Sequence, residues 1–184
     1  PLEKLGLVSL DENEDGVKHV RITGFGRMFL NGEISLGDVV FTSLLKTQFP
    51  NPLEDGRKDY NIKPFIGTLR LIKRVNELCA IQEINAVGVS REEFGIFVLS
   101  LKSYLDIDHV ASRIIAFRLT KRSLLTEEEK TDFVHNYISD YLRNFHNPHK
   151  NIKEYTDNII RYLRLTKYIY VRGGGYYIDL EPRR

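Results

Sequence analysis

Acidic and basic residues in the right order could form the site of a metal-dependent nuclease. Such a site needs an Asp on one strand and, on the next strand, an acidic residue one position before a Lys, so that carboxylates hold the water-activating metal. Asp179 and Glu181 stand close to the end of the chain with no Lys after them, and Asp55, Lys58 and Asp59 fall in a segment without an adjacent apolar strand. We therefore predict no catalytic residue in this chain.

Two other patterns could indicate chemistry. His146 and His149 are three residues apart and His135 lies upstream, but no cysteine or cluster of acids accompanies them, so a solvated helix end is favoured over a zinc site. The glycines at 173–175 precede a strand-like segment, which favours a hairpin turn over a phosphate loop. The sequence predicts neither a metal site nor a cofactor.

The strongest chemical case is DNA binding by a helix-turn-helix. Ser90 with Glu93 predicts a capping box and a helix over residues 90–99, and a polar turn at 100–105 leads to a second helix over 106–118, capped by Asp106 or Asp108. Two short capped helices joined by a tight turn are typical of this motif. Five residues are predicted to contact the DNA backbone: Arg91, Lys102, Ser103, Lys121 and Arg122. Three on the second helix are predicted to contact base edges or nearby phosphates: His109, Ser112 and Arg113.

The last part of the chain predicts a second DNA-contacting element. A helix over 152–163 is followed by residues 168–172, which alternate in polarity, by a glycine turn, and by a returning strand. A helix that leads into a glycine-tipped hairpin is typical of a winged helix, in which the hairpin is the wing. The predicted contacts here are Lys150, Arg161, Arg164, Lys167, Arg172, Gly174 and Tyr176. For any one of these cations the alternative is a solvated basic surface.

The first part of the chain predicts a similar hairpin and helix. Residues 2–10 lead through an acidic turn to a strand at 17–22, Thr23 is placed to cap a helix over 24–31, and Gly32 is placed to end it. Winged-helix proteins show this order directly after their recognition helix, so we expect that helix to lie largely upstream of Pro1. Further helices are predicted over residues 35–46, 63–79 and 126–145.

These elements predict a mainly α fold with small β-hairpins, an α+β arrangement of winged-helix or helix-turn-helix units in tandem. Residues 1–60 would hold the remainder of a first unit and a linker, and residues 61–184 a second unit that ends in a wing. Residues 1–60 carry 7 basic and 10 acidic side chains, whereas the rest of the chain carries 20 and 15. The basic surface is therefore expected in the second unit.

Composition excludes several classes of protein. With 42% hydrophobic and 28% charged residues the chain is typical of a soluble globular protein. Its single cysteine, Cys79, permits no internal disulfide, and the sequence has neither a membrane span nor a signal peptide, so we expect the cytoplasm. The net charge of +2 says little about partners, because the basic residues are concentrated in one part.

The chain also resembles a known family. Four stretches are similar, in order and spacing, to the N-terminal recognition region of AlwI-type type IIS restriction and nicking endonucleases: LGLVSLDE…VRITGFGRMFLNG, DVVFTSLLKTQFP, NIKPFIGTLRLIKRVNEL and IIRYLRLTKYIYVRGGGYYIDLEP. Members of this family bind a short asymmetric site in double-stranded DNA through winged-helix-type subdomains. They cut at a fixed offset with a separate C-terminal PD-(D/E)xK nuclease domain, whose motif has no counterpart here.

The resemblance implies a target-recognition fragment without enzymatic activity of its own, from a restriction-modification hydrolase. Magnesium would be needed only by the absent nuclease domain, which would lie elsewhere in the protein or on a partner subunit. Two alternatives stay open at this stage. One is a winged-helix transcriptional regulator, which should have a complete first unit and a dimer interface; the other is a winged-helix scaffold for protein interactions, which the near-neutral charge allows.

Overall fold

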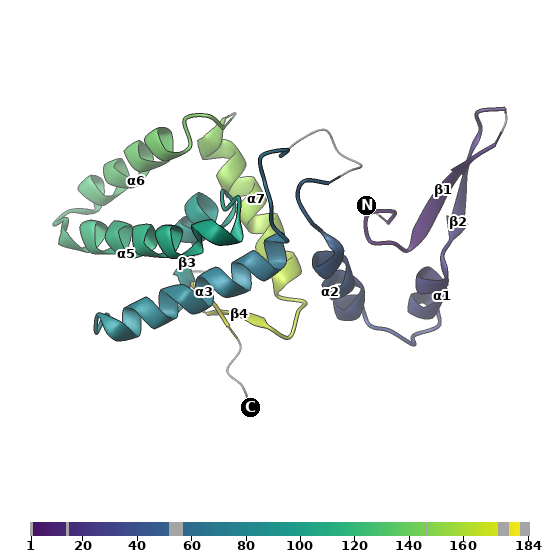
Figure 1. The fold of residues 1–184 in the computed structure, drawn as a ribbon, viewed down its shortest axis with the longest axis horizontal. Helices are drawn as coiled ribbons and strands as arrows, with labels where there is room; N and C mark the ends of the chain where they lie inside the picture. The colour runs from purple at the N-terminus through teal and green to yellow at the C-terminus, as the bar shows by residue number, and fades with distance from the viewer. Residues whose placement is uncertain (1, 14, 52–56, 146, 173–176, 181–184) are drawn as a thin grey trace. The chain divides into compact units, whose positions relative to one another are not determined.

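The computed structural model describes residues 2–13, 15–51, 57–145, 147–172 and 177–180, and it forms two compact units, Pro1–Thr47 and Gln48–Arg184 (Figure 1). The predicted contact residues Gly174 and Tyr176 lie outside the described residues, as do Asp55 and Glu181. The fold is mainly helical with small antiparallel sheets, as the hydrophobic patterns predicted. None of the described helices is both long and apolar enough to cross a membrane.

The first unit consists of a hairpin and two helices. β1 (Val8–Glu12) pairs antiparallel with β2 (Lys18–Ile22), and α1 (Gly24–Leu30) and α2 (Leu36–Lys46) follow. Thr23 caps α1 as predicted, because its Oγ1 accepts from the backbone N–H of Gly26 at 2.9 Å. The same hydroxyl donates to the carbonyl oxygen of Gly6 at 2.7 Å, so one side chain joins the start of α1 to the segment before β1.

The second unit begins with a long helix and a short strand. The backbones of Phe49 and Ile62 pair and bring together the two ends of the segment between them. α3 (Pro64–Ile81) buries a stripe that includes Phe65, Ile72 and Val75, as its periodicity predicted. β3 (Val89–Ser90) was not predicted, because a two-residue strand has no periodicity of its own.

The predicted helix-turn-helix segment folds differently in detail. After one turn of α-helix, α4 (Arg91–Glu93), the chain continues as a π-helix, η1 (Phe94–Val98), in which all five residues are buried. A 3₁₀ turn, η2 (Tyr104–Asp106), leads directly into α5 (Ile107–Ser123), which runs five residues beyond the predicted end. The predicted aspartate cap is confirmed in position only: Asp106 occupies the N-cap position of α5, but its side chain accepts no capping hydrogen bond. Ser103 Oγ accepts instead from the backbone N–H of Leu105 at 3.2 Å, at the start of η2.

Two more helices and a hairpin complete the second unit. α6 (Glu127–Tyr141) starts at the predicted capping box of Thr126 and Glu129. α7 (Pro148–Leu163) starts four residues earlier than predicted, because Pro148 occupies the first helical position, where a missing N–H has no cost. β4 (Ile169–Arg172) and β5 (Tyr177–Leu180) then pair antiparallel, and β5 also pairs with β3, so the strand order is β3-β5-β4.

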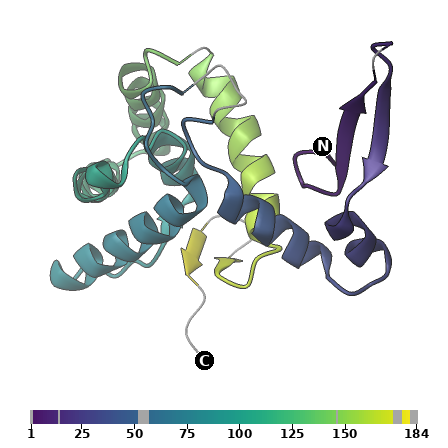
Figure 2. The same cartoon turned by 45° about the vertical axis from the view of Figure 1, so that its right-hand side comes forward.

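Packing around η1 forms the core of the second unit. Phe97 makes ring contacts with Phe117 of α5 and with Tyr137 and Tyr141 of α6, at centroid distances of 5.3–5.6 Å. α5 packs against α3 and contacts α6 less extensively, and α7 packs against η1 and α6 (Figure 2). α5 therefore lies between α3 and α6, whereas α7 is the helix that directly precedes strand β4 in the chain.

Candidate nucleic-acid interface

Three of the cations predicted to contact DNA form ion pairs with carboxylates of the chain. Arg91 contacts Asp157 of α7, and Lys102 contacts Asp59. Lys121 Nζ lies 2.5 Å from Glu92 Oε2. The hydrogen bond from Lys102 lowers the pKa of the Asp59 carboxyl, and the same bond raises the pKa of Lys102. Each of these cations would have to leave its carboxylate before it could contact a phosphate.

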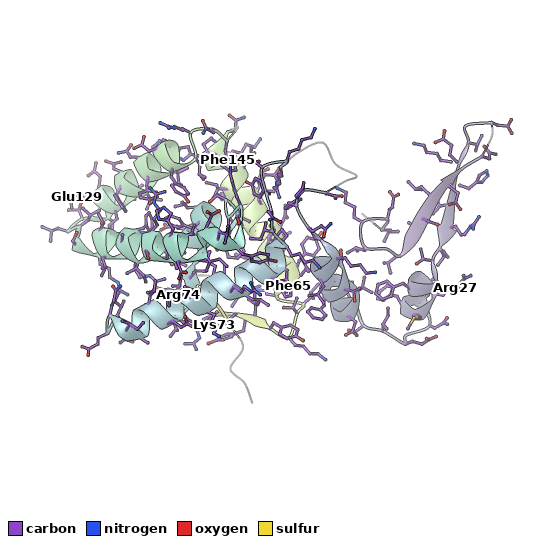
Figure 3. All side chains as sticks on the ribbon, viewed as in Figure 1. Arg27, Phe65, Lys73, Arg74, Glu129 and Phe145 are labelled. Atoms are coloured by element: carbon purple, nitrogen blue, oxygen red, sulfur yellow. The ribbon has the colours of Figure 1, made fainter. Side chains whose placement is uncertain are left out.

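The polar side of α5 is also engaged within the protein. The Ser112 hydroxyl donates to the carbonyl oxygen of Asp108 at 2.9 Å, and Arg113 lies over the Tyr141 ring at 4.8 Å from its centroid. Arg74 Nε donates to Asp108 Oδ1 at 2.6 Å; Figure 3 labels Arg74 beside Lys73 on α3. His109 and Arg122 are exposed. Of the predicted base contacts on this helix, only His109 forms no hydrogen bond, ion pair or ring contact with another described residue.

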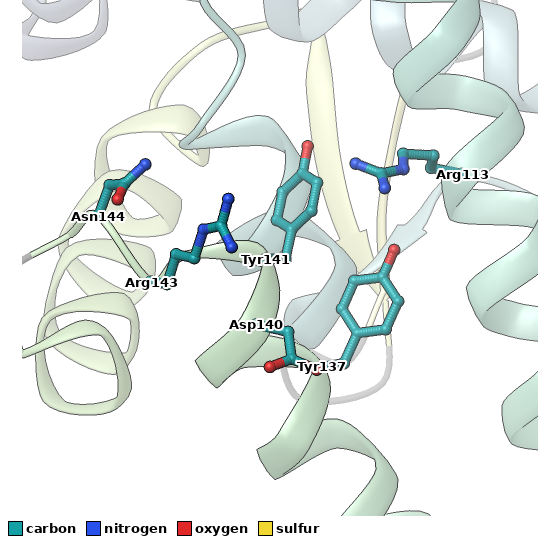
Figure 4. Close-up of a pocket in the computed structure, with 6 residues that line it drawn as sticks. All are labelled: Arg113, Tyr137, Asp140, Tyr141, Arg143 and Asn144. Carbon is teal, nitrogen blue, oxygen red and sulfur yellow. The ribbon is translucent and has the colours of Figure 1, made fainter.

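A surface pocket of about 410 Å³ adjoins Arg113, and it was not predicted from the sequence. In Figure 4, Tyr137 and Tyr141 project from α6 and Arg113 reaches toward them from α5. The remaining lining residues are Asp140, Arg143 and Asn144. Burial raises the pKa of Tyr137. The only sign of this cluster in the sequence was the four-residue spacing of the two tyrosines, which places them on one face of a helix. The same spacing also predicts ordinary core packing, so it did not identify a pocket.

The basic residues of α7 and of the segment after it are arranged differently. Lys150, Arg161, Arg164 and Lys167 are exposed, and no carboxylate of the described residues pairs with them. Arg172 is exposed and packs on the ring of Tyr170, 4.9 Å from its centroid. We define these five side chains as the α7–β4 basic group. Its members are available to an external anion without breaking an ion pair to another described residue.

Exposed tyrosines accompany the α7–β4 basic group. Tyr155 and Tyr162 of α7 are 56% and 49% exposed, and Tyr168, which follows α7, is 49% exposed. Tyrosine carries a large apolar ring, and exposed aromatic rings beside cations are typical of nucleic-acid and protein interfaces. Tyr155 and Tyr162 of α7 thus add exposed aromatic rings to the positive charge of this group.

The described acids and histidines that were considered for catalysis have structural partners. Asp179 is buried, and its Oδ1 accepts from Asn76 Nδ2 at 2.9 Å and from its neighbour's backbone N–H. His135 and His149 stack with ring centroids 4.1 Å apart, and His149 Nε2 lies 3.0 Å from the Ser139 hydroxyl. Within the described part of the chain, no three His, Cys, Asp or Glu side chains are grouped as metal ligands would be.

A buried polar network around Arg118 was also not predicted. Arg118 donates to Glu93, to the Gly88 carbonyl oxygen at 3.0 Å and to Cys79 Sγ at 3.2 Å. Burial raises the pKa of the Cys79 thiol, so this cysteine is a structural acceptor. The network holds α5 against α3 and the start of α4, and Arg118 takes no part in the exposed surface.

Comparison with known proteins identifies the family. The family model described as AlwI restriction endonuclease matches residues 3–184, nearly the whole chain, and no curated protein matches. The match includes both compact units and every described element of the second unit. Restriction endonucleases act on DNA, which agrees with the exposed cations of the α7–β4 basic group. The chain therefore belongs to the AlwI restriction endonuclease family.

Proposed function

We propose that this chain recognises a specific sequence in double-stranded DNA on behalf of a type IIS restriction or nicking endonuclease. The observation that carries the proposal is the α7–β4 basic group, five exposed cations with no internal carboxylate partner among the described residues. Phosphate contacts from such side chains supply much of the affinity for DNA and position the protein on the duplex. Family membership supplies DNA as the substrate.

The connectivity of the second unit supports a winged-helix assignment for it. A helix (α3) precedes a short strand (β3), further helices follow, and a hairpin (β4–β5) returns to pair with that first strand. In the first unit a hairpin is followed by the capped helix α1. On this proposal, residues 1–60 and 61–184 are tandem DNA-binding units, and the hairpins are their wings.

DNA cleavage is assigned, on this proposal, to a nuclease domain or subunit distinct from residues 1–184. Its magnesium ions would be held by carboxylates of that domain. Two of the acids considered for catalysis have partners within this chain, which supports this division. Asp179 accepts a hydrogen bond from Asn76, and Asp59 pairs with Lys102. With magnesium added, the purified 184-residue chain should leave duplex DNA intact; specific cleavage would refute this part of the proposal.

Salt-dependent binding tests the central claim. Fluorescence anisotropy of a labelled random-sequence duplex should show binding at low salt whose affinity falls steeply as salt rises, because each phosphate contact releases counterions. Absence of binding at low salt, or equal affinity at low and high salt, would refute DNA recognition. The first of these outcomes would favour a protein-interaction scaffold.

A further inference from the structure

We infer that α7, rather than α5, enters the major groove of DNA, and that Asn158 of α7 contacts a base edge there. This inference rests on the proposed function and assigns its sequence-specific step to one helix. It replaces the sequence-based expectation that His109, Ser112 and Arg113 of α5 contact bases. Three independent features of the described residues support it.

The first feature is the position of α7 in the chain. A winged-helix protein has its recognition helix directly before the wing. α7 ends at Leu163 and β4 begins at Ile169, whereas α6 and α7 separate α5 from that hairpin. A 16-residue helix is about 24 Å long, and the major groove is wide enough to admit a helix. The helix that the connectivity places beside the wing is therefore α7.

The second feature is the electrostatic character of the two exposed helix faces. Asp108 of α5 is paired with Arg74, but α6, which contacts α5, begins with three consecutive exposed glutamates. These carboxylates would repel phosphates approaching α5. α7 presents Lys150, Lys153 and Arg161 beside one exposed carboxylate, Glu154, and its Asp157 is paired with Arg91. One of the two carboxylates of α7 is therefore neutralised by a cation of α4.

The third feature is how α7 is held. Thr156, Ile160 and Leu163 are 1%, 6% and 2% exposed and anchor one side of the helix in the core. Gly95 of η1 permits close approach, because a Cβ at this position would lie 2.4 Å from Ile152 Cγ2. Exposed residues follow one another along the opposite side of α7. One side of α7 is therefore fixed against the core and the opposite side is exposed to solvent. Precise base contacts require a helix that is held in this way.

The side chains on that outer face supply the chemistry of base recognition. Glu154, Asn158 and Arg161 follow one another at spacings of four and three residues, which puts them on one stripe of the helix. An asparagine amide can donate to N7 of adenine while its oxygen accepts from the N6 amino group, arginine matches guanine or a phosphate, and glutamate accepts from cytosine. Asn158 carries no charge, so its contribution would be to sequence preference more than to overall affinity.

The test begins with selection of binding sites by the 184-residue chain from a random pool of duplexes, followed by the same selection with Asn158→Ala. The preference at one or two base pairs should disappear, and affinity for the selected site should fall about 10- to 100-fold, as expected when one bidentate base contact is removed. Affinity for unrelated DNA should stay unchanged. Alanine is favourable at an exposed helix position, so the variant should fold, which circular dichroism checks.

Two matched variants make the test specific. Asn136→Ala removes an exposed amide from α6, and Ser112→Ala removes the predicted contact on α5; both should select the wild-type site. Loss of base preference in Ser112→Ala but not in Asn158→Ala would overturn the inference. Salt-dependent binding without any sequence preference in the wild-type chain would overturn it too and leave phosphate contact standing. No DNA binding at all would refute the proposed function itself.

Discussion

Arg118 and Glu93 join α5 to α4 through a buried ion pair with two hydrogen bonds. Arg118 Nε lies 2.9 Å from Glu93 Oε1, and Arg118 Nη2 lies 2.7 Å from Glu93 Oε2. The side chains are 7% and 4% exposed. Burial disfavours the charged form of Arg118, but the hydrogen bonds to Glu93 outweigh it and the pKa of Arg118 is raised. Glu93 also accepts from the Ser90 backbone N–H, so one carboxylate serves the pair and the capping box.

Replacement of Arg118 should destabilise the second unit strongly. Arg118→Met leaves the Glu93 carboxylate buried without its cation, and removal of one partner of a buried pair costs about 3–5 kcal/mol. Urea denaturation followed by circular dichroism measures this free energy. Lys121→Met is the control, since its pair with Glu92 is 30% and 46% exposed and should contribute at most about 1 kcal/mol. Equal destabilisation of the two variants would contradict a structural role for the buried pair.

Removal of two cations from the α7–β4 basic group should weaken DNA binding irrespective of sequence. Arg164→Ala with Arg172→Ala should also make the dependence of log affinity on log salt shallower, by about one unit for each phosphate that the variant no longer neutralises. Anisotropy titrations at several salt concentrations provide both quantities. Lys102→Ala removes a cation that is paired with Asp59 and should change the slope less. An unchanged slope in the double variant would exclude these arginines from the interface.

A methyl group at position 95, introduced by Gly95→Ala, should disturb the packing of α7 against η1. The added Cβ would lie 2.4 Å from Ile152 Cγ2 and 2.8 Å from Thr156 Oγ1, so α7 or η1 must shift. Overpacking of this kind costs about 1–3 kcal/mol. Thermal or urea unfolding of Gly95→Ala measures the cost. Asn158→Ala on the exposed side of the same helix should change stability by about 0.5 kcal/mol or less, and a comparable destabilisation there would show that contact with η1 is not the cause.

The His135–His149 stack should be sensitive to acid. Partial burial, and to a smaller extent His135, lowers the pKa of His149 below the ordinary histidine value. The unfolded chain then takes up a proton at higher pH than the folded chain does. The stack therefore contributes stability above the ordinary histidine pKa, and that contribution is lost as pH falls through the lowered value.

NMR titration of the histidine ring protons measures this effect directly. The midpoint of His149 should lie below the ordinary value for histidine and should rise in His135→Gln, because the neighbouring cation is removed. An unchanged His149 midpoint in His135→Gln would show that the two rings do not interact in solution.

Local features of the fold were predictable because their hydrogen bonds lie within a few residues. The capping boxes at Ser90 and Thr126, each with a glutamate three residues later, begin helices as expected. The role of Asp108 was not predictable in the same way, because its carboxylate pairs with Arg74, 34 residues earlier in the chain. Competition from a distant cation cannot be read from spacing within one segment.

By itself, the sequence determined family membership through its resemblance to AlwI-type enzymes. It also determined the helical character of the chain and both hairpin-forming regions, because composition and short-range periodicity encode them. Tertiary structure alone decided which cations stay available for DNA. The local sequence does not distinguish the cations Lys102 and Arg118 from Arg161 and Arg164. The first two nevertheless pair with carboxylates 43 and 25 residues away, whereas the last two remain exposed. The Coulomb energy of a pair depends on distance in space, and folding brings together charges whose separation in the sequence gives no sign of their contact.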